Sequence, residues 1–370
     1  MSHAAPTMSP RPIVGMICPY EPGKPIEDVR RELGLIHIIK LASNENPLGP
    51  SPKVVSALNR TNLSLHHYPD FNGTALREDL ARHLGVPMDH LILGAGSAEL
   101  MKTLADTCLE RGNEGIVADI CFSVYHNVIS IAGATPVVVP LRPDLSQDLA
   151  RTRAAVTERT RIVFLASPNN PTGRLVPFAD LCAFVRDLPP TVIAALDLAY
   201  WEYIDDAQAY DLLPLLNELP NVVILRTFSK AHGLAGLRVG YAIARPEVIR
   251  WMERVRIPFN TSTAAQVAAQ VALSDPDHLA RTLALNRAMR TRLVQGLEAL
   301  GLTTWPSQAN FVLADTGQNS EQVFSRFLRK GIIVRPVGHP RLSTCIRVTT
   351  GTEEEVERFL AELPAVLAGP

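Results

Sequence analysis

Short runs of apolar residues, each too brief to be an ordinary helix, recur through the first two thirds of this 370-residue chain. Most are continuous rather than alternating, which is typical of strands in a mostly parallel sheet covered by helices on both faces. The expected strands are His90 to Leu93, Gly115 to Ala118, Thr135 to Val139, Arg161 to Ala166, Val192 to Leu196, Val222 to Thr227 and Val239 to Ile243. Helical stretches separate many of them, so we predict an α/β fold whose active site lies in loops beyond the strand ends.

The pattern changes after Arg245, where helical periodicity replaces the alternation of strands and helices. We expect a helix from Pro246 to Ile257 and a long helical region from about Thr263 to Gly301, broken near Asp275. A smaller α+β segment then ends the chain. Its expected elements are strand Phe311 to Leu313, helix Ser320 to Lys330, strand Ile332 to Val334, strand Cys345 to Val348 and helix Thr352 to Leu367. The sequence therefore predicts an N-terminal arm (1–35), a large α/β domain (36–257), and interdomain helices with a small C-terminal α+β domain (258–370).

Charge and cysteine content narrow the class of protein. The 36 Lys and Arg residues nearly balance the 37 Asp and Glu residues, which argues against nucleic-acid binding and against a polybasic membrane anchor. No apolar stretch reaches the 18 residues or so of a transmembrane helix. The five cysteines are scattered without a CxxC pair, so we expect reduced thiols in a cytoplasmic protein and no metal site. The polar, Pro-rich start (1–12) is expected to be a flexible arm rather than a secretion signal.

Four polar positions follow the ends of predicted strands. They are Asn170 within Ser167–Gly173, Asp197 with Tyr200 behind it, Lys230 in Thr227–Lys230, and Arg238. Each has an ordinary structural explanation: a turn for Asn170, a helix N-cap for Asp197, and an exposed surface charge for the two basic residues. Their order and their intervals of 27, 33 and 8 residues carry more information than any one of them.

This arrangement resembles the fold type I pyridoxal-phosphate (PLP) aminotransferases and, within them, the histidinol-phosphate aminotransferase family. Supporting strings are Pro19-Tyr20, Pro22 to Ile26, Lys40 to Pro50 and His67 to Asp70. The resemblance extends from about Pro19 to the C-terminal helix. It implies a large domain with a seven-stranded, mostly parallel sheet and a smaller α+β domain. It also implies PLP as the cofactor.

The resemblance assigns roles around the cofactor ring. Lys230 would bind the cofactor aldehyde covalently and then move the proton of the substrate Cα. Asp197 would pair with the pyridine nitrogen and keep it protonated, which strengthens the electron sink. Asn170 and Tyr200 would hydrogen-bond the phenolic oxygen of the ring. Phe122 matches the position whose ring stacks on the pyridine, although core packing is its simpler explanation.

The phosphate of the cofactor needs close backbone approach and positive charge. The turn from Gly94 to Gly96 leads into a predicted helix, whose N-terminus favours anions. A tight strand–helix connection would explain the same glycines without any ligand. By resemblance, the phosphate ligands are Gly96, Ser97, Ala98, Thr227, Ser229 and Arg238.

Further residues are implied to serve the substrate and a second subunit. Tyr68 resembles a tyrosine that reaches the phosphate of the neighbouring subunit's PLP, and Tyr20 resembles an arm tyrosine that reaches the neighbour's substrate. Both imply a homodimer with shared active sites. Asn46, Arg335 and Arg347 match substrate-binding positions. A guanidinium suits phosphate or carboxylate, whereas an internal salt bridge is the alternative for each arginine.

The resemblance favours one reaction and leaves others open. The favoured reaction is transfer of an amino group between histidinol phosphate and 2-oxoglutarate, as in histidine biosynthesis. An aromatic amino-acid aminotransferase and an enzyme like threonine-phosphate decarboxylase are the alternatives. A PLP-binding sensor domain is disfavoured because no helix-turn-helix segment precedes this chain, and a dinucleotide site lacks its third glycine after Gly96. Leu198, where relatives often have Glu, and Cys121, where proline is common, depart from the family pattern.

Overall fold

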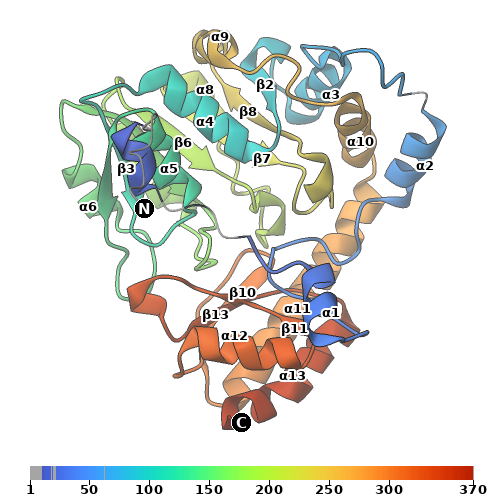
Figure 1. The fold of residues 1–370 in the computed structure, drawn as a ribbon. Coiled ribbons are helices and arrows are strands. Elements are labelled where there is room, and N and C mark those ends of the chain that lie inside the picture. Colours follow the sequence, from blue (N-terminus) through green and yellow to red (C-terminus); the bar gives the residue numbers. More distant parts are fainter. Residues whose placement is uncertain (1–10, 18, 20–21, 62, 370) are drawn as a thin grey trace, which may run out of the picture.

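A seven-stranded sheet forms the larger part of the computed structural model, which describes residues 11–17, 19, 22–61 and 63–369 (Figure 1). The strand order is β2-β8-β7-β6-β5-β3-β4. All neighbours pair in parallel except β8, which is antiparallel to both β2 and β7. The strands are β2 (Leu91–Gly94), β3 (Glu114–Ala118), β4 (Thr135–Val139), β5 (Thr160–Ala166), β6 (Ile193–Asp197), β7 (Val222–Thr227) and β8 (Gly240–Ala244). The predicted seven-stranded, mostly parallel sheet is thus confirmed.

Helices cover both faces of this sheet, and alternate residues of each strand feed two separate cores. One core joins the sheet to α4 (Ser97–Cys108), α5 (Val124–Ile131) and α9 (Pro246–Val255). The opposite core contains side chains from five helices: α2 (Pro52–Arg60), α3 (Thr74–Leu84), α7 (Phe178–Asp187), α8 (Pro214–Glu218) and α10 (Thr263–Leu273). A further short helix, α6 (Leu149–Ala154), precedes β5. Burial on both faces explains why these strands are continuous apolar runs.

The smaller part is a four-stranded antiparallel sheet in the order β12-β13-β10-β9. Its strands are β9 (Thr303–Thr304), β10 (Phe311–Asp315), β12 (Arg335–Pro336) and β13 (Cys345–Thr349). Three helices pack on it: α11 (Pro276–Ala299), α12 (Ser320–Arg329) and α13 (Glu353–Ala368). A two-stranded parallel pair joins β1 (Ile39–Lys40) to β11 (Ile332–Ile333), next to α1 (Ile26–Leu33). The early segment at residues 39–41 therefore packs with C-terminal elements.

Most expected elements have the predicted type, with ends shifted by one or two residues. The break in the long helical region lies where expected, because α10 ends at Leu273, with Ser274 as its C-cap, and α11 begins at Pro276. The expected strand Ile332 to Val334 is instead two short strands, because residues 332–333 pair with β1 whereas residues 335–336 pair with β13. No apolar pattern reveals the two-residue strands β1 and β9. Within the described ranges, no helix is long and apolar enough to cross a membrane.

Candidate active site

A cavity of about 170 Å³ opens where the C-terminal ends of β5, β6 and β7 meet the smaller sheet. Twelve predicted site residues line it, and ten of them come from the larger sheet and its loops: Ser97, Ala98, Phe122, Asn170, Asp197, Tyr200, Thr227, Ser229, Lys230 and Arg238. Arg335 and Arg347 line it from the smaller sheet, and Gly23 and Ser43 from the N-terminal region. Residues spread over three hundred positions thus converge at the strand ends, which is where the ligands of parallel sheets bind.

Asp197 is the last residue of β6, and its carboxylate is buried at the floor of the cavity. One oxygen, Oδ2, accepts a hydrogen bond from the Tyr125 hydroxyl at 2.5 Å, and Oδ1 accepts one from the backbone N–H of Ala199 at 3.0 Å. Burial raises the pKa of Asp197 above its ordinary value, while these two hydrogen bonds and the charge of Lys230 oppose the shift. Asp197 therefore caps the following turn through the Ala199 N–H and also lines the cavity.

Lys230 follows β7 and places a buried amine in the same cavity. Its Nζ donates a hydrogen bond to the backbone oxygen of Ser43 at 3.2 Å. Burial, followed by the positive charge of Arg347, lowers the pKa of Lys230 to about 8. More of this amine is therefore neutral near physiological pH than of an ordinary lysine, which favours its action as a nucleophile or proton acceptor.

Positive charge and a helix N-terminus form an anion cradle at one end of the cavity. Arg238 donates to the Ser229 hydroxyl at 3.2 Å, and Ser229 N–H donates to Thr227 Oγ1 at 3.1 Å. Gly96, with a φ of +82°, precedes the first residue of α4, and a Cβ there would lie 2.5 Å from Arg238 Nη2. Arg238 itself has a φ of +54°, a region that non-glycine residues seldom adopt and that is found most often at functional sites. A phosphate suits this set of donors.

Two arginines approach the cavity from adjacent strands of the smaller sheet. Arg335 on β12 and Arg347 on β13 are register partners. Arg347 donates to Asn170 Oδ1 at 2.6 Å and to the backbone oxygen of Ala42 at 2.5 Å. Its guanidinium also lies 5.3 Å from the centre of the Phe311 ring. Asn170 and Arg347, 177 positions apart, are thereby tied together across the two sheets.

Tyr200 and an unpredicted asparagine form a second link between the two parts of the chain. Asn44 Nδ2 donates to the Tyr200 hydroxyl at 2.8 Å, and Asn44 also exchanges hydrogen bonds with the Thr349 hydroxyl at 3.0 Å. By contrast, Asn46 lies outside the cavity lining, and its Nδ2 donates to Ala231 oxygen and Thr282 Oγ1. Both asparagines occur in the string from Lys40 to Pro50, and Asn44 is the one that lines this cavity. The substrate contact of Asn46 stays a prediction.

The remaining predicted residues lie elsewhere or outside the described part of the chain. Tyr68 is 81% exposed, stacks on Phe259 with ring centres 4.5 Å apart, and does not line the cavity. An exposed ring is what contact with another subunit would require. Tyr20 lies outside the described residues. Tyr125 was not predicted as a site residue, yet it lines the cavity and donates a hydrogen bond to Asp197. The sequence offered one indication of this position: Tyr125 comes three residues after Phe122, the predicted ring-stacking residue.

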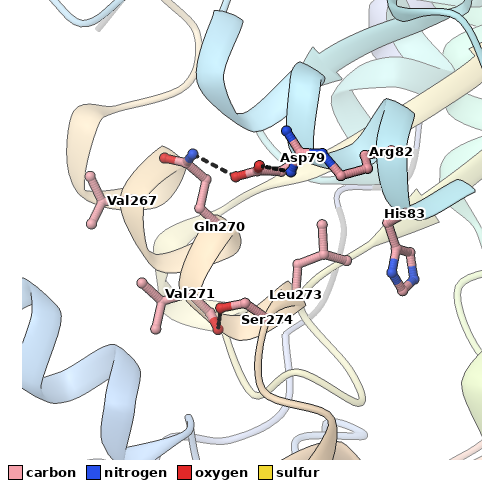
Figure 2. A pocket seen from close by; sticks show the side chains of 8 residues that line it. All are labelled: Asp79, Arg82, His83, Val267, Gln270, Val271, Leu273 and Ser274. Atoms are coloured by element: carbon pink, nitrogen blue, oxygen red, sulfur yellow. Dashed lines mark hydrogen bonds and ion pairs between the residues drawn. The ribbon is translucent and has the colours of Figure 1, made fainter.

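A larger cavity of about 470 Å³ lies between α3 and α10, away from the strand ends (Figure 2). Three of its polar side chains bond one another, because Asp79 accepts hydrogen bonds from both Arg82 and Gln270. Val267, Val271 and Leu273 supply its apolar wall. No lysine or strand end contributes to this lining, so size alone does not identify the chemical site.

The residues at the strand ends fit PLP in number and chemical type. Arg238, Ser229 and the N-terminus of α4 suit its phosphate, and the absence of a side chain at Gly96 keeps the cradle open. Lys230 suits its aldehyde, and Asp197 suits a ring nitrogen. Fold and site therefore define a class of enzyme in which a lysine and a phosphate-bearing cofactor act together.

Comparison with known proteins leads to the same class. Residues 36–363 match the family Aminotransferase class I and II. Histidinol-phosphate aminotransferase of Moorella thermoacetica is 46% identical over 353 residues, covering 95% of this chain and 91% of that protein. Histidinol-phosphate aminotransferase 1 of Nitrosococcus oceani is 43% identical, with 95% of each chain covered.

Solved structures agree with the sequence relatives. The crystal structure of histidinol-phosphate aminotransferase from Sinorhizobium meliloti in complex with pyridoxal-5'-phosphate matches with a TM-score of 0.90 and 30% identity. That match covers 99% of this chain and 98% of the other. This chain belongs to the class I and II aminotransferase family and has the fold type I architecture that its sequence resembled.

Proposed function

We propose that this protein is a PLP-dependent aminotransferase that exchanges an amino group between histidinol phosphate and 2-oxoglutarate, a step of histidine biosynthesis. The substrate follows from relatives of 42–46% identity that carry this name and match about 95% of the chain. The observation in the structure that carries the reaction type is the buried amine of Lys230, with its pKa lowered to about 8, in one cavity with Asp197 and the anion cradle.

The residues of the cavity divide the work between binding and proton transfer. PLP, when bound, supplies an electron sink for the electrons released at the substrate Cα. Lys230 would accept the proton released at the substrate Cα and pass it to the C4′ carbon of the cofactor, and in the second half-reaction it would carry a proton from C4′ to the Cα of the second substrate. Asp197 holds a proton on the ring nitrogen, while Asn170 and Tyr200 hold the phenolic oxygen. Thr227, Ser229, Arg238 and residues Gly96 to Ala98 hold the phosphate, and Phe122 supports the ring face.

The substrate's anionic end is assigned to the two arginines of the smaller sheet. Arg335 and Arg347 are cross-strand partners on the cavity wall, so two positive charges lie close enough to share one anion. A bidentate guanidinium binds either phosphate or carboxylate. This pair would accept the phosphate of histidinol phosphate in one half-reaction and a carboxylate of glutamate in the other.

We further propose a cytoplasmic homodimer with shared active sites. The exposed ring of Tyr68 and the arm tyrosine Tyr20 would complete the partner's site, as the family resemblance implies. We also propose that the chain divides as its sequence predicts, into an arm (1–35), a PLP-binding domain (36–257), and interdomain helices with the small domain (258–370). Tyr68→Ala should weaken PLP binding, and sedimentation should give the mass of a dimer.

A half-reaction screen tests the proposed substrate. The PLP-loaded enzyme is mixed separately with histidinol phosphate, phenylalanine, tyrosine and threonine phosphate, while the cofactor spectrum and the products are followed. Histidinol phosphate should convert the cofactor fastest. Preference for phenylalanine, or release of carbon dioxide from threonine phosphate, would contradict the substrate assignment and identify one of the alternatives.

Borohydride reduction tests the chemistry independently of substrate. It should fix the cofactor on the single peptide that contains Lys230. Labelling of any other lysine would contradict the central assignment.

A further inference from the structure

Tyr125 makes a contact that the family assignment does not explain. Its hydroxyl donates to Asp197 Oδ2 at 2.5 Å, and both side chains are buried. The two residues lie 72 positions apart, on α5 and at the end of β6. A hydrogen bond to a charged acceptor in a buried place is stronger than one at the surface.

The packing around Tyr125 leaves its hydroxyl little freedom to move. The ring stacks on Phe164 of β5 with centres 5.0 Å apart and planes 5° apart, while Phe122 meets it edge-on at 5.9 Å. Tyr125 is in the first turn of α5, and Phe122 is two residues before that helix begins. One short segment therefore presents an aromatic ring to the cavity and a phenol to Asp197.

The carboxylate of Asp197 is held by two donors, one on each of its oxygens. Tyr125 occupies Oδ2, and the Ala199 N–H occupies Oδ1. Each oxygen keeps one further lone pair, so the carboxylate remains able to accept from a ligand. The other titratable groups that act on this pair are Lys230, Tyr200 and Cys121.

We propose that Tyr125 is a positioning residue that fixes the orientation and the charge of Asp197, and that it thereby controls how strongly the enzyme protonates the cofactor's ring nitrogen. This inference rests on the proposed function, because it assigns Asp197 to the ring nitrogen. Tyr125 acts through Asp197 rather than on substrate.

The directions of the pKa shifts agree with this role. Burial, and then the negative charge of Asp197, raise the pKa of Tyr125 well above its ordinary value, so the phenol stays protonated and acts as the donor. The hydrogen bond from Tyr125 lowers the pKa of Asp197 and opposes the effect of burial. Without the phenol, Asp197 would hold a proton itself more readily and leave less positive charge on the ring.

Tyr125→Phe in the PLP-loaded enzyme tests the proposal. A less positive ring withdraws fewer electrons from the lysine-linked nitrogen. The pH midpoint of the visible absorbance change should therefore rise by about half a unit or more. PLP should dissociate about tenfold more readily, the effect of losing one charged hydrogen bond.

Tyr210→Phe is the matched control. Tyr210 is also buried, and its hydroxyl bonds Ser167 at 2.7 Å and Val176 oxygen at 2.9 Å, without touching Asp197. It should lose thermal stability but keep the spectral midpoint of the parent enzyme. An unchanged midpoint in Tyr125→Phe, with only a loss of stability like that of Tyr210→Phe, would overturn the positioning role.

Two further measurements separate the possible explanations. In an Asp197→Asn background, Tyr125→Phe should add less than a twofold change in PLP affinity, because the residue acts through Asp197. Replacing Tyr125 by 3-fluorotyrosine keeps the ring but strengthens the donor, so the midpoint should move down. A midpoint that is unchanged or moves up would contradict the proposal even where the phenylalanine variant does not fold.

Failure of this proposal and failure of the proposed function give different results. Absence of a borohydride-labelled Lys230 peptide in the parent enzyme would defeat both. A labelled parent with identical midpoints in the parent, Tyr125→Phe and fluorotyrosine proteins would defeat only the role of Tyr125.

Discussion

The two faces of the sheet at the ends of β6 and β7 bury charges in opposite ways. On the cavity face lie Asp197 and Lys230, with Thr227 at the edge of the anion cradle. On the other face, Arg226 donates to Glu202 at 2.7 Å and lies 4.2 Å from the centre of the Trp201 ring. Residues of the back face are close in sequence to cavity residues: Arg226 directly precedes Thr227, and Trp201 and Glu202 directly follow Tyr200.

The difference between the faces lies in where each charge finds its partner. The ion pair of Arg226 and Glu202 is complete within the chain, and the nearby His232 stays neutral because burial lowers its pKa to about 4. The cavity charges instead suit the groups of a ligand: phosphate for Arg238, a ring nitrogen for Asp197, an aldehyde for Lys230. The number of buried charges therefore does not identify the active face. What identifies it is whether each buried charge is paired within the chain or is available to a ligand.

Removal of the cavity amine should have the largest effect. Lys230→Ala should lower kcat on the order of 10⁴-fold, because both the covalent link and the proton carrier are lost. PLP should still bind without a covalent link, as equilibrium dialysis would measure. Lys102→Ala, which removes an exposed lysine of α4 paired with Asp106, is the matched control and should keep full turnover. Normal turnover of Lys230→Ala would contradict the mechanism.

Breaking the back-face pair should reduce stability rather than substrate recognition. Arg226→Ala leaves Glu202 buried without its partner and should cost about 3–5 kcal/mol in the free energy of unfolding. Urea denaturation measures the loss, and KM of the folded fraction should stay close to that of the parent. Replacing both residues, as Arg226→Met with Glu202→Leu, should restore part of the stability. A selective change in KM would mean that the two faces are not separate.

A pH titration of stability sharpens the same comparison. In protein freed of PLP, the pKa of Lys230 is about 8 when folded, against an ordinary value of 10.5 when unfolded. The unfolded chain thus holds one more proton between these pH values, so this residue makes stability rise with pH there, by about 3 kcal/mol over the interval. Urea unfolding across pH 8 to 10 should show this rise, and Lys230→Met should lack it. Equal slopes in the two proteins would contradict the buried amine.

The smallest expected effect comes from the arginine between the two sheets. Arg347→Ala should lower kcat/KM for both histidinol phosphate and 2-oxoglutarate by about 10- to 100-fold, equivalent to one or two charged hydrogen bonds. Arg292→Ala, which removes a surface ion pair with Glu357, should leave both values unchanged. Unchanged kinetics in Arg347→Ala would remove Arg347 from the substrate site and leave it a structural role through its contacts with Asn170, Ala42 and Phe311.

Local pattern was sufficient for the strands of the larger sheet, whereas most of the cavity residues were predicted from the family resemblance. A continuous apolar run such as Val222 to Thr227 can be read directly because both faces of β7 are buried. The direction of pairing was not readable: β8 is antiparallel to its neighbours although its residues resemble those of a parallel strand. Pairing direction depends on how the chain connects in space, which a single run does not encode.

Contacts between segments far apart in the chain could not be predicted from local sequence patterns. Asn44 meets Tyr200 and Thr349, whereas Asn46 two residues away bonds Ala231 and Thr282 instead. The same residue type fits either role. In the structure Asn44 has a left-handed backbone, with a φ of +55°, and lines the cavity, and neither property is visible in the sequence pattern. Tyr125 likewise looks like a core aromatic until Asp197 is brought beside it.

The pairing of β1 with β11 has a consequence during synthesis of the protein. Residues 39–40 leave the ribosome early, yet their partners at 332–333 are made nearly at the end. Asn44 and Thr349, which bond each other nearby, are 305 positions apart, so at ~5–20 residues per second the early segment waits roughly 15–60 s. During that interval Leu41, which is buried in the finished fold, has no C-terminal core to enter. Leu41 therefore gains its buried surroundings only in the last stage of synthesis.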